Sequence, residues 1–283
     1  MHWSQQNVKS TGTKAVVKSH PLRAPGLDSG LRLFVHSSSD VHISSQIREL
    51  GVWEAFETQL LLRYLKPGDC FLDVGANIGY FTVIAAARVG DSGCVYAFEP
   101  EPANFALLRR NLELNGVERQ VCAQQAALAD SEGELQLHLH PDNLGDHQVF
   151  ASAANRVRVT VPSLRGADAL AGKKDSVQLV KIDTQGAEHM VVQGLMPLLQ
   201  ASLPGLRMIV ELTPFSLRGA GSSGAELIGL LAELGLPLAI IDHIEHALVP
   251  TSAAELVRWC ENVDACAGDE GFMNIFVGEI GTT

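Results

Sequence analysis

The sequence predicts a doubly wound α/β fold, in which helices cover both faces of a mostly parallel β-sheet. Short apolar runs bounded by turn residues alternate with segments of helical periodicity, and this alternation is the pattern of successive βαβ units. The chain has 283 residues, which is enough for one large α/β domain with a sizeable core. Its composition, 46% hydrophobic and 19% charged, is typical of a globular protein rather than a disordered one.

The regular part of this alternation starts near residue 54. Phe56, Leu60 and Tyr64 share one helical face, and Pro67-Gly68 ends that first helix. The runs that read as strands lie at 70–74, 95–98, 121–128, 177–182, 207–210, 238–241 and 273–277. The later helices are predicted at 81–88, 103–114, 187–200 and 225–234.

Two segments depart from the alternation. Residues 1–50 are predicted to form a polar N-terminal arm or cap, and residues 51–283 the main domain. A short alternating stretch at 31–35, followed by Gly51-Val52-Trp53, indicates a small β-rich lead-in. At 133–163, leucines and then valines alternate with polar residues on either side of a polar loop, which predicts a β-hairpin insertion.

Charge and composition argue against several classes of partner. The net charge is −11, whereas a protein that binds the phosphates of nucleic acid or an anionic membrane needs an excess of Lys and Arg. The first twenty residues contain no apolar run of a secretory signal, and charged residues and Pro237 interrupt the most apolar stretch, 225–249. The five cysteines show no CxxC spacing. We therefore expect a cytoplasmic protein with reduced core cysteines.

The end of the first strand carries a glycine turn. The run Asp73-Val74-Gly75-Ala76-Asn77-Ile78-Gly79 allows a tight turn and a close approach of the backbone to a ligand, and Asn tolerates a left-handed conformation. The next strand exits into Glu99, where a carboxylate can accept both ribose hydroxyls of an adenosine. Together these residues predict an adenosine-containing cofactor, the alternative being a tight turn and a surface acid without a ligand.

NAD and S-adenosylmethionine are the two cofactors to be weighed. The NAD fingerprint requires GxGxxG, but Thr82 stands where the third glycine would fall after Gly79. S-adenosylmethionine has no phosphate and instead needs an acidic rim for its cationic sulfonium and ammonium groups, which Asp73 supplies. The residues favour S-adenosylmethionine.

Several short stretches between residues 51 and 212 resemble the FkbM methyltransferase family. They are Gly51-Val52-Trp53-Glu54, Pro67-Gly68-Asp69, Asp73 to Thr82, Ala97-Phe98-Glu99-Pro100, Asn111-Leu112, Asn115-Gly116, Val180-Lys181-Ile182-Asp183, Gln185-Gly186, Glu188 and Glu211. The resemblance implies a class I methyltransferase fold with a seven-stranded sheet, and methyl transfer from S-adenosylmethionine to oxygen. Its implied acceptor is a small hydroxylated molecule, such as a sugar or a natural product.

The resemblance also implies roles for individual residues around the cofactor. The methionine part of S-adenosylmethionine would be lined by Asp73, Gly75, Asn77 and Gly79, and Glu99 would hold the ribose. After the third strand, the adenine would contact Ala127, Leu128 and Asp130.

Transfer to an alcohol requires alignment of the reacting atoms and a base for the hydroxyl proton. Lys181, Asp183 and Glu211 lie at the predicted carboxyl ends of the fourth and fifth strands. Asp183 is our first choice for the base, and Lys181 either pairs with it or stabilises an alkoxide. A purely structural network among these three residues is the alternative.

The acceptor site is predicted from loops. Asn143 and Gly145 lie in the polar loop of the hairpin insertion, and Glu188 follows the fourth strand, where it either caps the helix or binds acceptor hydroxyls. We predict no metal site, the alternative being a divalent cation held by Asp183 and Glu211. The pairs His138/His140 and His243/His246 are interpreted as solvated, because neither pair has a Cys or His partner at zinc-ligand spacing. An NAD-linked oxidoreductase and a non-catalytic module of the same fold remain alternative functions.

Overall fold

The computed structural model describes residues 18–27, 30–37, 40–151, 156–173, 176–266, 268 and 270–281. Its central sheet is built from β3 (Cys70–Val74), β4 (Cys94–Phe98), β5 (Val121–Gln124), β9 (Leu179–Ile182), β10 (Arg207–Leu212), β11 (Leu238–Asp242), β12 (Ala247–Thr251) and β13 (Met273–Val277). In the described part of the chain these form an eight-stranded sheet with the order β12-β11-β13-β10-β9-β3-β4-β5.

The direction of the strands confirms the predicted fold class. From β5 to β10 the strands are parallel, whereas β13 runs antiparallel between β10 and β11. The strand order reverses at β3, so that the chain winds first toward β5 and then toward β12, as in a doubly wound sheet. The eighth strand, β12, was not predicted. It pairs with β11 across a turn, and Pro250 within it hides the strand pattern.

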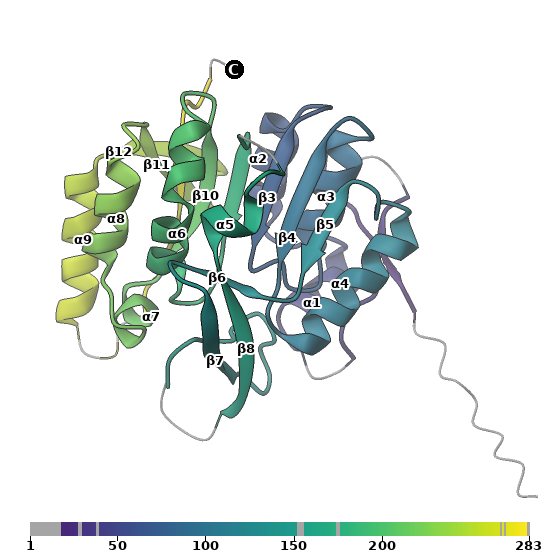
Figure 1. Cartoon of the computed structure of the whole chain (residues 1–283), viewed down its shortest axis with the longest axis horizontal. Helices are drawn as coiled ribbons and strands as arrows, with labels where there is room; N and C mark the ends of the chain where they lie inside the picture. Colours follow the sequence, from purple (N-terminus) through teal and green to yellow (C-terminus); the bar gives the residue numbers. More distant parts are fainter. Residues whose placement is uncertain are drawn as a thin grey trace, which may run out of the picture.

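Helices cover both faces of the sheet (Figure 1). One face packs on α5 (Gly166–Leu170), α6 (Glu188–Ala201), α7 (Pro214–Gly219), α8 (Gly224–Ala232) and α9 (Ala253–Ala265). The other packs on α1 (Ile43–Leu50), α2 (Ala55–Tyr64), α3 (Tyr80–Val89) and α4 (Pro102–Asn115). In β3, Leu72 and Val74 belong to the first core and Phe71 to the second, because side chains alternate along a strand.

A second, three-stranded sheet lies beside the carboxyl ends of the central strands (Figure 1). It consists of β6 (Ala127–Ala129), β8 (Val157–Arg165) and β7 (Gly133–Leu139), in that order. The predicted hairpin is confirmed, with Leu135 opposite Val161 and Leu137 opposite Val159. The single strand predicted at 121–128 was wrong, because β5 ends at Gln124 and β6 joins the other sheet.

The predicted β-rich lead-in is mainly helical. β1 (His20–Pro21) and β2 (Arg32–Leu33) form only a two-residue pair, and α1 follows them. Ile43 and Ile47 are one turn apart and both buried, and Gly51 ends the helix with φ 74°. Polar residues between the two isoleucines obscured this helix in the sequence.

Three further helices were missed, namely α5, α7 and α9. The sequence did carry a signal for α9, because Ser252 and Glu255 form a capping box at its start. Among the described residues, no helix is both long and apolar enough to cross a membrane.

Candidate active site

The glycine turn between β3 and α3 is shaped by contacts within the protein. Gly75, Asn77 and Gly79 have φ values of 82°, 50° and 86°. A Cβ atom on Gly75 would lie 1.9 Å from the carbonyl oxygen of Asp183, and one on Gly79 would lie 3.2 Å from Cγ of Leu108. Glycine at these positions therefore lets the turn pack against the end of β9 and against α4.

Asp73 lies behind this turn. It is 2% exposed, and the Thr82 hydroxyl donates a hydrogen bond to its Oδ2 atom over 2.5 Å. Burial raises the pKa of Asp73 to about 6. Neither Asp73 nor Gly79 lines either of the two hollows at the carboxyl ends of the strands.

A hollow at the carboxyl ends of β3, β4 and β9, here called the inner cavity, brings together many of the predicted cofactor residues. Gly75, Asn77, Glu99, Ala127 and Leu128 all line it. Its other walls include the apolar residues Val74, Phe98, Ala126, Leu137 and Val149. Asp130 is not among the lining residues. It is exposed, and its Oδ1 atom accepts a hydrogen bond from the Ser131 hydroxyl.

Glu99 is almost fully enclosed at the end of β4. Its Oε2 atom accepts from the backbone N–H of Asn77, and its Oε1 atom from that of Glu101, each over 2.8 Å. Burial raises the pKa of Glu99 to about 8, although these two hydrogen bonds act in the opposite direction. The carboxyl group therefore fixes the glycine turn from the wall of the inner cavity.

The loop at 140–149 closes one side of the inner cavity. The side-chain amides of Asn77 and Asn104 each donate a hydrogen bond to the carbonyl oxygen of Leu144 over 3.0 Å. Leu144, Gly145 and His147 line the cavity from this loop. The turn that forms one wall of the cavity thus also holds the loop that covers it.

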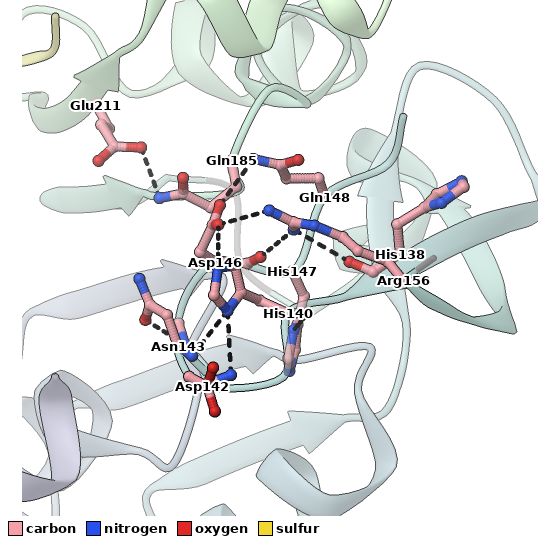
Figure 2. Close-up of polar contacts among 11 residues, drawn as sticks. His138, His140, Asp142, Asn143, Asp146, His147, Gln148, Arg156, Gln185 and Glu211 are labelled. Carbon is pink, nitrogen blue, oxygen red and sulfur yellow. Dashed lines mark hydrogen bonds and ion pairs between the residues drawn. The ribbon is translucent and has the colours of Figure 1, made fainter. Parts of the chain in front are cut away.

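Polar contacts give this loop a fixed shape (Figure 2). Nδ1 of His140 accepts the backbone N–H groups of Asp142 and Asn143. Arg156 forms an ion pair with Asp146 over 2.9 Å and also donates to its carbonyl oxygen. Burial lowers the pKa of His147 to about 4, and Arg156 contributes to that shift. His147 is consequently neutral near pH 7.

A second hollow, here called the outer groove, begins where the inner cavity ends. Gly145, Asp183 and Gln185 line both. Asn143 and Glu211 line the outer groove only. The shared wall is the place where a group bound in the inner cavity would meet a molecule bound in the outer groove.

The predicted catalytic residues lie together at this wall. In the strand registers Lys181 is opposite Asp73 and Ile209, so that Asp183 and Glu211 follow on the same face of the sheet. Nζ of Lys181 is 2.8 Å from Oδ2 of Asp183. Lys181 lines neither hollow, because it is buried beneath Asp183 with its Nζ 4.7 Å from the ring centre of Phe81.

Gln185 and Glu54 complete the network. Nε2 of Gln185 donates to Oδ1 of Asp183 over 3.0 Å and to Oε2 of Glu211 over 2.8 Å, as Figure 2 shows for Glu211. Oε2 of Glu54 is 3.3 Å from Nζ of Lys181. Asp183 therefore has a charged partner on one oxygen atom and an amide donor on the other.

The titration of these groups reflects their enclosure. Burial raises the pKa of Glu54 to about 7. Burial and the neighbouring Asp183 carboxylate raise the pKa of Glu211 well above its ordinary value. Burial lowers the pKa of Lys181, but the carboxylates of Asp183 and Glu54 more than offset this effect and raise it overall.

Glu188 does not reach either hollow. It is fully buried, and its carboxylate accepts hydrogen bonds from the backbone N–H groups of Thr184 and Gly186 and from the Thr184 hydroxyl. Its contacts are those of a residue that orders the loop between β9 and α6. These bonds go to residues before α6, whose N-cap Ala187 makes no side-chain cap, so Glu188 does not cap the helix.

Three side chains at the site were not predicted to belong to it, namely Gln185, Glu54 and His243. Gln185 and Glu54 lie within the stretches that carried the family resemblance, but no role was assigned to them. His243, expected to be solvated, lines the outer groove with Nδ1 3.3 Å from Oε1 of Glu57. Asn274 donates to the same oxygen atom over 2.6 Å. Within the described residues, no three His, Cys, Asp or Glu side chains are placed to hold a metal ion.

Comparison with known proteins shows similarity to methyltransferases. A model of the methyltransferase FkbM domain matches residues 73–236. Methyltransferase 1 of Beauveria bassiana (strain ARSEF 2860) is 31% identical over 150 residues, which cover 46% of this chain and 59% of that protein. The 31-O-demethyl-FK506 methyltransferase FkbM of Streptomyces tacrolimicus is 36% identical over 104 residues, which cover 36% of this chain and 39% of that protein.

These matches span less than two thirds of the length of either relative. Among solved structures, the methyltransferase FkbM from Methylobacillus flagellatus KT aligns with a TM-score of 0.44 and 11% identity, over 78% of this chain and 50% of that chain. The family model covers both the glycine turn and the Lys181–Asp183 strand end. The chain belongs to the FkbM methyltransferase family.

Proposed function

We propose that this chain methylates a hydroxyl oxygen of a small molecule, such as a sugar or a natural product. The observation that carries the proposal is the shared wall, where Asp183 and Gln185 border both the inner cavity and the outer groove. An enzyme that transfers a methyl group must bring donor and acceptor together in line, which is mainly a task of positioning.

The inner cavity suits S-adenosylmethionine in its chemistry. Apolar walls that include Ala127 and Leu128 suit an adenine ring, and the Glu99 carboxyl suits ribose hydroxyls. Gly75 and Asn77 would adjoin the methionine part. When bound, S-adenosylmethionine supplies a methyl group that its positively charged sulfur has already activated.

The outer groove suits a small acceptor better than a nucleic acid. Its lining includes the carboxyl groups of Glu54, Asp146, Asp183, Glu211 and Glu270. Arg156, the groove's one arginine among the lining residues that the structure describes, is already paired with Asp146. A polyanionic backbone would meet unfavourable charge in this groove.

Asp183 is the residue that we assign to the hydroxyl proton. One of its oxygen atoms accepts from Gln185 and the other lies against Lys181, so the carboxylate is oriented by two partners. A carboxylate at the shared wall can accept the proton of the acceptor hydroxyl while its oxygen atom bonds to the methyl carbon and the bond from that carbon to sulfur breaks. Glu211 shares Gln185 as a partner and would orient the acceptor beside it.

Titration calorimetry tests the cofactor half of the proposal. S-adenosylhomocysteine should bind the purified chain with micromolar affinity, and NAD in a parallel titration should not bind. If NAD alone bound, the assignment of the inner cavity to S-adenosylmethionine would be wrong.

The acceptor half needs a screen with methyl-labelled S-adenosylmethionine. Sugars and hydroxylated natural products form one panel, and amines of matched size form the control panel. Mass spectrometry of the products should locate the new methyl group on oxygen. Transfer only to nitrogen or carbon would contradict the proposal while leaving the methyltransferase activity intact.

A further inference from the structure

A third hollow lies beside α4, and His36 in its lining is hydrogen-bonded to Asn104 of the inner-cavity wall. Residues 18–20, residues 35–37, Arg48 of α1 and one face of α4 enclose it. We call it the basic pocket. None of its lining residues lines the inner cavity or the outer groove.

The charge of this pocket is opposite to that of the protein. Lys18, Arg48 and Arg110 line it together with His20 and His36, and its lining contains no Asp or Glu among the residues that the structure describes. The whole chain carries 32 acidic residues against 21 lysines and arginines. Basic side chains therefore outnumber acidic ones in the described lining of this pocket, whereas the reverse holds in the whole chain.

The positive charge is not neutralised within the described residues. Arg48 donates to the backbone carbonyl oxygens of His36 and Ser37, and Arg110 lies 4.5 Å from the ring centre of Phe34. Neither arginine has an ion pair with a described carboxylate. Residues 1–17, which precede Lys18, contain no Asp or Glu.

The pKa of His20, which lines the pocket, is lowered by burial and by this excess of positive charge. Burial lowers the pKa of His20, and Lys18, Arg48 and Arg32 lower it further. No carboxylate of the described part of the chain acts on this pKa in the opposite direction. The electrostatic field in the pocket is thus favourable for an anion.

The floor of the pocket has a different character from its rim. Ala103, Ala106 and Leu107 of α4 form it, together with Val35. These residues offer an apolar surface next to the cations. The combination suits a molecule that carries an anionic group on an apolar body, because each part finds a matching surface.

We propose that the basic pocket binds a small organic phosphate, with its phosphoryl group against Lys18, Arg48 and Arg110 and its apolar part on α4. A phosphate monoester carries close to two negative charges at neutral pH and presents several acceptor oxygen atoms, which suits three cations in the lining of one pocket better than a carboxylate does. The proposal does not rest on the identity of the methyl acceptor.

Phenyl phosphate is the probe for a calorimetric test. The protein is first saturated with S-adenosylhomocysteine, so that the inner cavity is occupied. Phenyl phosphate should bind at one site, and benzoate and phenol should each bind at least 10-fold more weakly. Binding should also weaken as salt is added, because the contact is largely electrostatic.

The chain offers a matched pair of variants on one helix. Arg109 and Arg110 are both exposed on α4, but only Arg110 lines the pocket. Arg110→Glu should reduce the affinity for phenyl phosphate at least 10-fold, and Arg109→Glu should leave it within 2-fold of the wild type. Lys18→Glu should reproduce the loss from a separate segment, which guards against a local effect of Arg110 on Phe34.

Three results would overturn the proposal. Wild-type protein that fails to bind phenyl phosphate has no such site. An equal loss in Arg109→Glu and Arg110→Glu would reveal a response to net charge alone. Benzoate or phenol binding as tightly as phenyl phosphate would mean that the pocket does not recognise phosphate.

Discussion

At the scale of single residues, Lys181 keeps a positive charge inside the protein because two carboxylates lie against it. Asp183 and Glu54 approach its Nζ atom to 2.8 and 3.3 Å. A buried charge without a partner lowers the free energy of unfolding, because it has lost its hydration. Removing one partner of a buried pair therefore destabilises the protein, since the other charge stays buried and unpaired. Substitutions at this site should therefore preserve the size and hydrogen bonding of the side chain. A change in turnover then reports on catalysis and not on a loss of folding.

Asp183→Asn meets this condition, since Lys181 retains Glu54 as a partner. If Asp183 accepts the hydroxyl proton, turnover should fall by about 10²-fold or more, while the affinity for S-adenosylhomocysteine changes little. Single-turnover kinetics and calorimetry measure the two effects. Asp130→Asn, the same change at an exposed carboxylate outside both hollows, is the control. Unchanged turnover in Asp183→Asn would remove Asp183 from the role of base.

The pair formed by His243 and Glu57 predicts a pH effect. The hydrogen bond to Glu57 raises the pKa of His243, so Glu57→Gln should bring that pKa down toward its ordinary value. NMR titration of the imidazole measures the change. Glu245→Gln, which alters an exposed carboxylate two residues away, should leave the pKa of His243 unchanged. Equal titration of His243 in wild type and Glu57→Gln would contradict the ion pair.

The same pair contributes to stability over a defined range of pH. The folded-state pKa of His243 is raised, so its contribution is present at low pH and is lost as the pH rises through that raised value. Burial raises the pKa of Glu57, but hydrogen bonds from His243 and Asn274 outweigh it and lower the pKa overall. Its contribution is therefore lost as the pH falls through the lowered value. Between the two pKa values both partners are charged and the pair contributes most.

At the scale of elements, the turn between β3 and α3 couples two strands to one loop. Gly75 lies against the Asp183 carbonyl at the end of β9, and Asn77 donates to the Leu144 carbonyl of the covering loop. Glu99 at the end of β4 accepts the Asn77 backbone N–H. The geometry of the inner cavity thus depends on contacts among several segments rather than on the turn alone.

Gly75→Ala tests this dependence against Gly90→Ala. Both glycines have positive φ, but a Cβ on Gly90 meets nothing within 4 Å, whereas one on Gly75 meets the Asp183 carbonyl oxygen at 1.9 Å. Gly90→Ala should cost about 1–3 kcal/mol of unfolding free energy, because its φ of 65° and ψ of −169° lie in a region that is almost restricted to glycine. Gly75→Ala should cost several times more, or fail to fold. Urea denaturation measures both, and equal costs would refute the close contact.

At the scale of the whole molecule, side-chain amides of α4 attach the N-terminal segment to the domain. Asn111 donates to the carbonyl oxygens of Phe34 and Ile78 and accepts the Phe34 N–H, and Asn115 does the same for Arg32. The bonds to Phe34 and Arg32 join residues 77 and 83 positions apart in sequence. They pair the backbone of the N-terminal segment with side chains of α4.

Asn111→Ala should loosen this attachment. It leaves the buried partners of the amide unsatisfied, at a cost of about 2–3 kcal/mol. Hydrogen exchange should become faster at residues 30–37, with a smaller change in the central sheet. Glu113→Ala on the exposed side of α4 is the control. Unaltered exchange at residues 30–37 would show that other contacts hold the segment.

The central strands could be predicted because their apolar runs are buried on both faces, as at Cys70–Val74 and Leu179–Ile182. The carboxyl-end rule then placed Asp183 and Glu211 correctly near one another. Helix α1 was not predicted, since only Ile43 and Ile47 are apolar on its buried side. The inward orientation of Glu188 and the bridging position of Gln185 depend on how a loop turns, which no local pattern specifies.

The strand β12 has a consequence for self-association. It is the outermost strand on its side of the sheet, and its residues include Pro250 opposite Ala239. Proline has no N–H group to donate, so an incoming strand cannot continue an unbroken ladder along this side. The residue that hides β12 in the sequence thus also makes the sheet's border a poor template for aggregation.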